Sequence, residues 1–90
     1  MSLALRQHIV AWLDDNYHFG DAEKLIKSDE MSFLQNGILD SLGFVQLILH
    51  LEKSCGVRFN RKDVTPKNFD ALGKILAYVT AMPGYREPSR

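Results

Sequence analysis

Apolar residues recur at helical spacing in three separate stretches of the chain, and this pattern predicts three main helices. The first helix is expected from about Ser2 to Asp15, with Ser2 as its N-cap. It should end at the run Asp14–Asn16, because these residues favour turns and acids are unfavourable at a helix C-terminus. Its apolar stripe consists of Leu5, Ile9, Trp12 and Leu13.

The second main helix is expected from about Ser41 to Ser54. Gly56 is well placed to end it, because glycine readily adopts the left-handed conformation that follows many helices. Cys55 falls on the apolar side, so a buried structural cysteine is expected rather than a reactive thiol. We interpret the apolar residues of this stretch as one broad stripe: Leu42, Val45, Leu47, Ile48, Leu49, Leu51 and Cys55.

The last main helix is expected from about Phe69 to Thr80, with Asn68 as its N-cap. A single turn over residues 63–65 should precede it, and Pro66 should stop that turn because proline cannot continue a helix. The apolar stripe of the last helix consists of Phe69, Leu72, Ile75, Leu76 and Val79.

The connection from about Asn16 to Asp40 is too long to be a bare loop in so small a domain. We expect a short helix near residues 21–27, capped by Asp21, and apolar side chains that anchor the remainder to the bundle. These anchors are Tyr17, Phe19, Leu25, Ile26, Phe33 and Leu34. With no convincing strand, the pattern predicts an all-α fold, a small four-helix bundle of three main helices and one short helix.

Composition narrows the classes of function that fit. Ninety residues form one domain, expected over residues 1–82, and the proline- and glycine-containing segment 83–90 is expected to be a flexible C-terminal tail. Acids and bases balance at zero net charge, which disfavours nucleic acid and anionic membranes as partners. No apolar run is long enough to span a bilayer, and a cytoplasmic location is the default expectation.

Cysteine and histidine give no sign of a metal centre. The single cysteine excludes an internal disulfide framework and a cysteine-based zinc site. The three histidines, His8, His18 and His50, are far apart and show no ligand spacing, so no metal site is expected.

The polar pair Asp40-Ser41 stands where a glycine-containing loop becomes the second main helix. Free N–H groups and the positive end of the helix dipole gather at such a point, and they favour a phosphate on a nearby oxygen. Nothing in the local sequence activates the Ser41 hydroxyl, since no histidine is near it and there is no G-x-S-x-G motif. Ser41 is therefore better suited to being modified than to attacking a substrate, although the pair could also serve only as a helix cap.

The stretch Gly37–Phe44, with sequence GILDSLGF, resembles the attachment motif of acyl carrier proteins and related stand-alone acyl, aminoacyl and peptidyl carriers. The resemblance extends to Val57–Phe59 and Asp63–Asp70, and covers most of the chain from about Leu5 to Val79. It implies a helical bundle of the acyl-carrier type. The three-residue core of the motif is weakly specific, but its position before an amphipathic helix and its downstream pattern make it much more so.

The resemblance implies a carrier that performs no catalysis of its own. A phosphopantetheinyl transferase would move 4′-phosphopantetheine from coenzyme A to Ser41, and the thiol of this arm would hold an acyl or aminoacyl group as a thioester. Asp40 matches the acidic residue that assists the modification, and Leu42 matches the apolar residue on which enzymes dock. A loading synthetase and downstream transferase or synthase enzymes are the other partners implied. The rival interpretation is an unmodified helical protein–protein interaction module of the same fold.

The second main helix is poor in acids, because Glu52 is the only acid between Ser41 and Cys55. It departs in this from the strongly acidic second helix of many fatty-acid carriers in the family, and the form GILDSLGF more closely resembles stand-alone carriers of aminoacyl or specialised-metabolite pathways. The basic cluster Lys53, Arg58, Arg61 and Lys62 is interpreted either as a solvated patch or as a docking site. The residues predicted to contact partners of this monomeric carrier are Gly43, Phe44, Gln46, Leu49, His50, Lys53 and Arg61. Whether Phe44 and Leu49 face a partner or the core is open at this stage.

Overall fold

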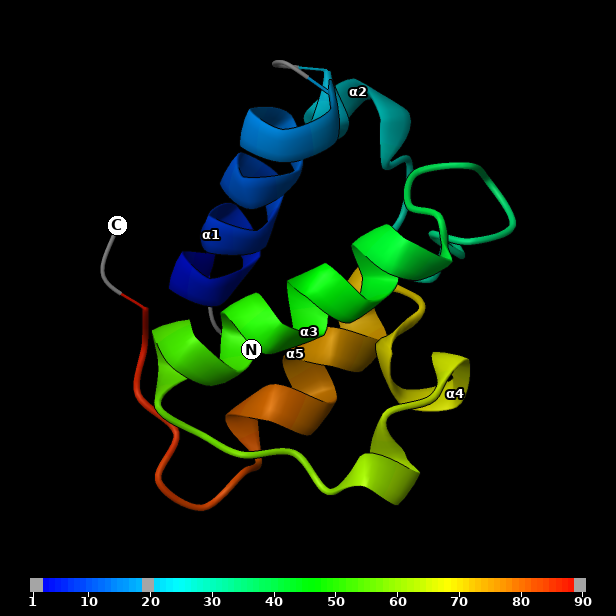
Figure 1. The fold of residues 1–90 in the computed structure, drawn as a ribbon. Helices are drawn as coiled ribbons and strands as arrows, with labels where there is room; N and C mark the ends of the chain where they lie inside the picture. The colour runs from blue at the N-terminus through cyan, green and yellow to red at the C-terminus, as the bar shows by residue number, and fades with distance from the viewer. Residues whose placement is uncertain (1–2, 19–20, 89–90) are drawn as a thin grey trace.

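The long helix α3 crosses the molecule, with α5 packed behind it, α1 on one side and α4 on the other (Figure 1). The computed structural model describes residues 3–18 and 21–88, and within these ranges the chain is helical with no strand. Three main helices with short helical turns confirm the predicted all-α fold class. The elements are α1 (Leu3–Leu13), η1 (Asp14–His18), α2 (Ala22–Leu25), α3 (Ser41–Cys55), η2 (Arg61–Asp63), α4 (Pro66–Phe69) and α5 (Leu72–Thr80).

One apolar core joins the three main helices. In α1 the predicted stripe is buried at three positions, while Trp12 is partly buried at its edge. The apolar stripe predicted for the last helix is fully buried. The largest completely buried side chains come from all three main helices and from the loops between them: Phe33, Phe69, Leu5, Ile9, Leu13, Leu47, Leu51, Leu72, Ile75 and Leu76. Helices with one apolar face are stabilised chiefly by this packing, not by intrinsic propensity.

Four predictions about the region before α5 are wrong. A 3₁₀ turn occupies Arg61–Asp63 in place of the turn expected over 63–65. Pro66 begins the short helix α4 instead of stopping a turn, because the first helical turn needs no N–H donor from proline. Asn68 lies inside α4 and donates from Nδ2 to the Asp63 carbonyl oxygen at 2.9 Å, so it caps no helix. The last helix consequently begins later than expected, at Leu72.

The end of α1 differs from the expectation in a related way. The run Asp14–Asn16 does not stop the helical path, which widens into the π turn η1. The Asp14 carboxylate accepts a hydrogen bond from the Ala22 N–H at 2.8 Å, whereas Asp21 makes no side-chain cap bond to α2. Asp14, which is distant in sequence, thereby takes the capping role predicted for Asp21. The predicted N-cap Ser2 and the predicted anchor Phe19 lie outside the described residues.

The connection between α2 and α3 is held against the start of α5 at two points. Asp70 is buried, and its carboxylate accepts hydrogen bonds from the Ser32 hydroxyl and, at 2.9 Å, from the Leu34 N–H. Gly73 N–H donates to the Asp29 carbonyl oxygen at 2.8 Å, and a Cβ at Gly73 would lie 3.1 Å from that oxygen. A larger residue at this position would fit only if the Asp29 carbonyl moved by a few tenths of an ångström.

The predicted anchors of the connection are only partly confirmed. Ile26 and Phe33 are buried, and Tyr17 and Leu34 pack against the core from its edge. Leu25 is 40% exposed, so it does not anchor the connection. In the chain beyond α5, Arg86 N–H donates to the Cys55 carbonyl oxygen at 3.0 Å. The flexibility expected of the tail stays a prediction.

Two further sequence expectations concern burial. Cys55 is fully buried, as predicted, and burial raises the pKa of its thiol. Among the described helices, none has the length and apolar character required to cross a membrane.

Candidate attachment site and docking face

Ser41 is the first residue of α3, and its position depends on Asp40. The Asp40 backbone is extended, and its Oδ1 accepts a hydrogen bond from the Gly43 N–H at 2.7 Å. This is an N-cap in which the carboxylate satisfies one of the free donors at the helix end. Both Asp40 and Ser41 are exposed, so the hydroxyl is accessible to a partner enzyme.

The cap leaves a specific set of donors beside the Ser41 hydroxyl. With the Gly43 N–H bound to Asp40, the N–H groups of Ser41 and Leu42 have no carbonyl within the helix to bind. The first turn of α3 contains no acidic residue, and the carboxylate that binds the positive end of its dipole is that of Asp40 at the N-cap. These features favour an anionic group on Ser41.

The loop that leads to Ser41 is fixed by its own backbone. Gly37 has a φ of 71°, in the left-handed region that favours glycine. The N–H groups of Ile38 and Leu39 both donate to the Phe33 carbonyl oxygen, at 2.9 and 3.2 Å. Ile38 and Leu39 are buried, and the chain then emerges at the exposed pair Asp40-Ser41.

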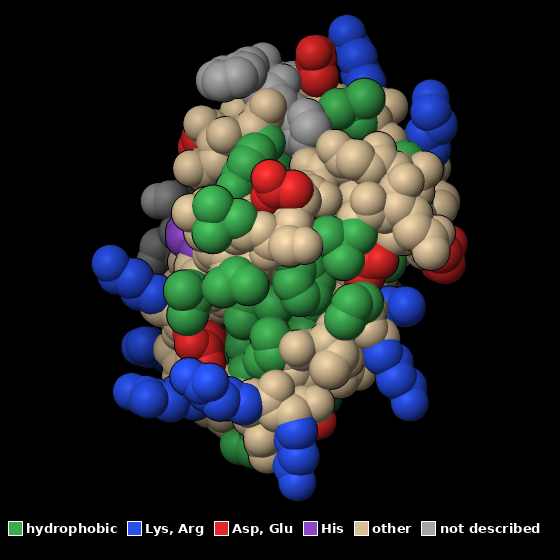
Figure 2. Space-filling view, turned by 45° about the vertical axis from the view of Figure 1, so that its right-hand side comes forward, with side chains coloured by type: hydrophobic (Ala, Val, Ile, Leu, Met, Phe, Trp, Pro, Cys, Tyr) green, Lys and Arg blue, Asp and Glu red, His purple; other side chains and the backbone are tan. Residues whose placement is uncertain are grey.

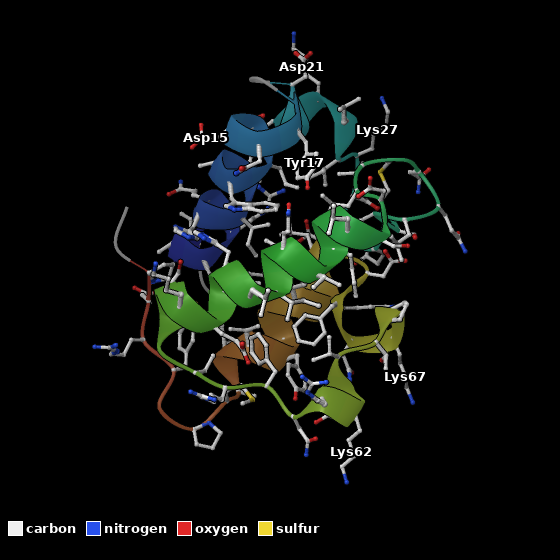
Figure 3. All side chains as sticks on the ribbon, viewed as in Figure 1. Asp15, Tyr17, Asp21, Lys27, Lys62 and Lys67 are labelled. Atoms are coloured by element: carbon white, nitrogen blue, oxygen red, sulfur yellow. The ribbon has the colours of Figure 1, made fainter. Side chains whose placement is uncertain are left out.

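Gly43 is buried, which contradicts its predicted place on the exposed side of the helix. A Cβ at this position would lie 2.8 Å from the Tyr17 hydroxyl oxygen and 3.0 Å from Leu39 Cδ2. Tyr17 belongs to η1, and its side chain extends towards the start of α3 (Figure 3). Its hydroxyl donates to Gln46 Oε1 at 2.8 Å. Gly43 thus provides the space in which Tyr17 covers α3. In the sequence, the only indication of this contact was a glycine within a helix that is otherwise rich in apolar residues.

The apolar residues of α3 divide into two faces, not the single core stripe that the pattern predicted. Phe44 is buried with 8% exposure, so of the two residues left open it is the one that faces the core. Leu42, Val45 and Leu49 are 65%, 48% and 59% exposed, and we refer to these three as the exposed row. The sequence alone could not separate the two faces, because apolar residues surround most of this helix.

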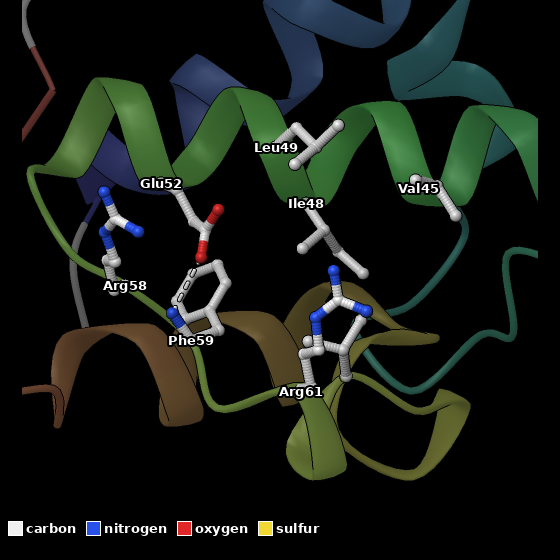
Figure 4. A pocket seen from close by; sticks show the side chains of 8 residues that line it. Val45, Ile48, Leu49, Glu52, Arg58, Phe59 and Arg61 are labelled. Carbon is white, nitrogen blue, oxygen red and sulfur yellow. Dashed lines mark hydrogen bonds between the residues drawn. The ribbon is translucent and has the colours of Figure 1, made fainter.

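A hollow of about 460 Å³ lies along the exposed row, between α3 and the segment that contains η2 (Figure 4). A helix turns by about 100° per residue, which places Val45, Ile48 and Leu49 within about 80° of Ser41 around the axis. The hollow and Ser41 therefore share one side of α3. Its lining consists of Val45, Ile48, Leu49, Glu52, Arg58, Phe59, Arg61 and Val64.

The charged side chains of this hollow are mainly cationic. Arg58 and Arg61 are exposed and lie on its lining. Glu52 is the one acid of α3, and its Oε2 accepts a hydrogen bond from the Phe59 N–H at 2.8 Å. Lys53 and Lys62 are also exposed, and Lys62 points away from the molecule beside η2 (Figure 3). The predicted basic cluster is therefore at the surface.

His50 faces α1, on the opposite side of α3 from Ser41 by about 180° of helical rotation. Its Nε2 lies 2.7 Å from His8 Nε2, and the two rings are stacked with centroids 4.9 Å apart. The ring centroid of Trp12 is 5.8 Å from that of His50. Burial lowers the pKa of His50, and the neighbouring His8 and Lys53 lower it further. The fold thus joins two histidines that the sequence separates.

The described residues contain no group of three or more His, Cys, Asp or Glu side chains that could hold a metal ion.

No family model matches the chain, and no solved structure matches it.

The curated proteins that match the chain include two named D-alanyl carrier protein. The protein from Abiotrophia defectiva is 29% identical over 58 residues, which cover 63% of this chain and 73% of that protein. The protein from Lacticaseibacillus rhamnosus is 36% identical over 53 residues, which cover 59% of this chain and 65% of that protein. The chain is thus distantly similar to two proteins named as carriers, and this similarity confirms the predicted resemblance to carrier proteins.

Proposed function

We propose that this carrier protein is modified on Ser41 with 4′-phosphopantetheine derived from coenzyme A. The observation that supports the proposal most directly is the exposed hydroxyl at the first position of a 15-residue helix. The residues around it fit the group, because the free N–H groups of Ser41 and Leu42 favour the phosphate that would be attached there. The cap bond from Asp40 to Gly43 holds this end of the helix in place.

The bound group would supply a terminal thiol that carries an acyl or aminoacyl unit as a thioester. The chain itself would position and present this thiol. The ring of His50 contacts His8 and Ser54 on the far side of α3, so His50 is not placed to serve as a base for Ser41. This supports a role for Ser41 as an attachment point and not as a nucleophile acting on substrates.

For the cargo, we propose an aminoacyl group, with D-alanyl as the first candidate. The support is the name of the two homologues, together with the acid-poor α3, whose one acid, Glu52, is engaged with Phe59. The proposed partners are a phosphopantetheinyl transferase, an adenylating synthetase that loads the thiol, and a transferase or synthase that accepts the cargo. A monomer in the cytoplasm stays the expectation from sequence.

Intact mass spectrometry tests the attachment. The purified chain is incubated with coenzyme A and a permissive phosphopantetheinyl transferase, and one added phosphopantetheine is expected. Ser41→Ala should abolish the addition, while Ser28→Ala, a change at another exposed serine, should leave it complete. If several transferases add nothing to the wild-type chain, the carrier proposal is wrong and the unmodified interaction module is favoured.

A second step tests the cargo separately. The modified protein is incubated with ATP, D-alanine and a ligase that loads D-alanyl carrier proteins, with L-alanine in a parallel reaction. D-alanyl cargo predicts an added alanyl mass that hydroxylamine removes, because hydroxylamine cleaves thioesters. Absence of loading on protein that carries the arm would reject D-alanine as cargo and leave the attachment at Ser41 unaffected.

A further inference from the structure

The exposed row gives α3 an uncovered apolar face. Leu42, Val45 and Leu49 are each about half to two-thirds exposed, and they span about 10 Å along the helix. Figure 2 shows hydrophobic side chains gathered in a continuous band on this side of the molecule, bordered by Lys and Arg side chains and also by some Asp and Glu side chains. A contiguous apolar patch with a polar rim is typical of an interaction surface.

The rim of this face carries a defined charge. Arg58 and Arg61 border the hollow, and Glu52, the one acid of α3, accepts a hydrogen bond from the Phe59 N–H (Figure 4). Arginine side chains at the edge of an apolar surface bind carboxylates with defined geometry. The face therefore selects for negative charge beside an apolar contact.

We propose that the exposed row and the hollow bind a protein partner through an apolar helical ridge flanked by carboxylates. Apolar side chains of the ridge occupy the hollow between α3 and η2, and the carboxylates pair with Arg58 and Arg61. The inference rests on the proposed function, because the exposed row begins at Leu42, directly after Ser41, and so lies beside the arm that the partner must reach.

The charges also argue against a second copy of this chain as the occupant. In a two-fold interface the same patch meets itself, so Arg58 and Arg61 of both copies would approach each other. Juxtaposed like charges disfavour such a dimer, whereas a partner with carboxylates is complementary. Titration of the protein with defined peptides can therefore test the assignment without knowledge of the natural partner.

The probe is a synthetic amphipathic helical peptide with leucines at i, i+3, i+4 and i+7 and glutamates beside them. A matched peptide has lysine at every glutamate position. Amide shifts of ¹⁵N-labelled protein are followed for each peptide, both before and after modification of Ser41. The glutamate peptide should shift Val45, Leu49 and Phe59, and it should bind roughly ten-fold or more tightly than the lysine peptide.

Charge reversal tests the role of the rim. Arg58→Glu with Arg61→Glu should weaken the glutamate peptide roughly ten-fold and strengthen the lysine peptide, an exchange that loss of structure cannot produce. Lys67→Glu with Lys74→Glu, an equal change of charge at two other exposed lysines, should alter neither affinity.

Three results would contradict the proposal. The first is equal binding of both peptides, and the second is shifts confined to another face or absent with either peptide at high concentration. The third is a dimer in light scattering that Leu49→Ser dissociates, which would assign the face to a second copy. Because attachment at Ser41 is measured by mass, failure here is distinct from failure of the proposed function.

Discussion

Asp40 has two separable properties, a hydrogen-bond acceptor and a negative charge. The acceptor is occupied by the Gly43 N–H at 2.7 Å, so the carboxylate stabilises the start of α3 before any enzyme is involved. The charge lies at an exposed position beside Ser41, where an approaching enzyme can meet it. Substitutions that remove one property and keep the other can assign each to its role.

Asp40→Ala should lower the free energy of unfolding by about 1 kcal/mol, because the Gly43 N–H loses its cap. Asp40→Asn keeps a capping oxygen and should change stability by only a few tenths of a kcal/mol. Urea unfolding of the two variants beside wild type measures the difference. Equal losses in both variants would show that charge, and not the cap, stabilises this helix end.

The cap and the serine could be predicted from sequence because both depend on neighbours within three residues. The burial of Gly43 could not, because it depends on Tyr17, which reaches α3 from a different element. Asp70 was missed for the same reason. Its partners Ser32 and Leu34 are 38 and 36 residues away in the chain, and no local pattern connects them.

At the scale of the element, α3 has two apolar sides, one buried in the core and the other exposed. Leu47 is 1% exposed and belongs to the core, while Leu49, two residues later, is 59% exposed. The same residue type therefore has a structural role at one position and an accessible surface at the other. A pair of identical substitutions can distinguish them.

Leu47→Ala should lower the free energy of unfolding by about 2–5 kcal/mol, since it removes buried methyl groups and leaves a cavity. Leu49→Ala should change it by no more than about 0.5 kcal/mol, as expected for a surface change. Chemical denaturation gives both values, and Leu49→Ala should still weaken the glutamate peptide. A large stability loss in Leu49→Ala would mean that the exposed row is in fact covered by the chain.

The existence and limits of α3 followed from its spacing, its cap and Gly56, whose φ of 69° ends the helix as predicted. The division of its faces did not follow, because eight apolar residues in fifteen positions leave several possible stripes. Only the packing of α1 and α5 against it determines which of them are covered. The late start of α5 has a similar origin, since Asp70, which ends α4, binds Ser32 and Leu34 far away in the sequence.

At the scale of the whole molecule, the contact between His8 and His50 joins α1 to α3. A hydrogen bond between two imidazole nitrogens needs one donor and one acceptor, so at least one ring must be neutral. Burial, His8 and Lys53 all lower the pKa of His50, and hence the fold favours the neutral ring. Stability should accordingly depend on pH near neutrality.

Below its unfolded-state pKa of about 6.5, His50 binds more protons in the unfolded chain than in the folded one. The free energy of unfolding should therefore fall as pH drops below about 6.5 and should level off above it. Urea unfolding over a pH series measures this slope. His50→Gln should flatten it, and an unchanged slope in that variant would assign the pH dependence to other groups.

The buried connection between Asp70 and residues 32–34 sets an order of events during synthesis. Asp70 follows its partners Ser32 and Leu34 by 38 and 36 residues, so it leaves the ribosome after them and after Ser41. The loop that presents Ser41 cannot reach its final form until the last third of the chain has arrived. A transferase that recognises the folded form of this loop would consequently distinguish the folded carrier from a nascent chain.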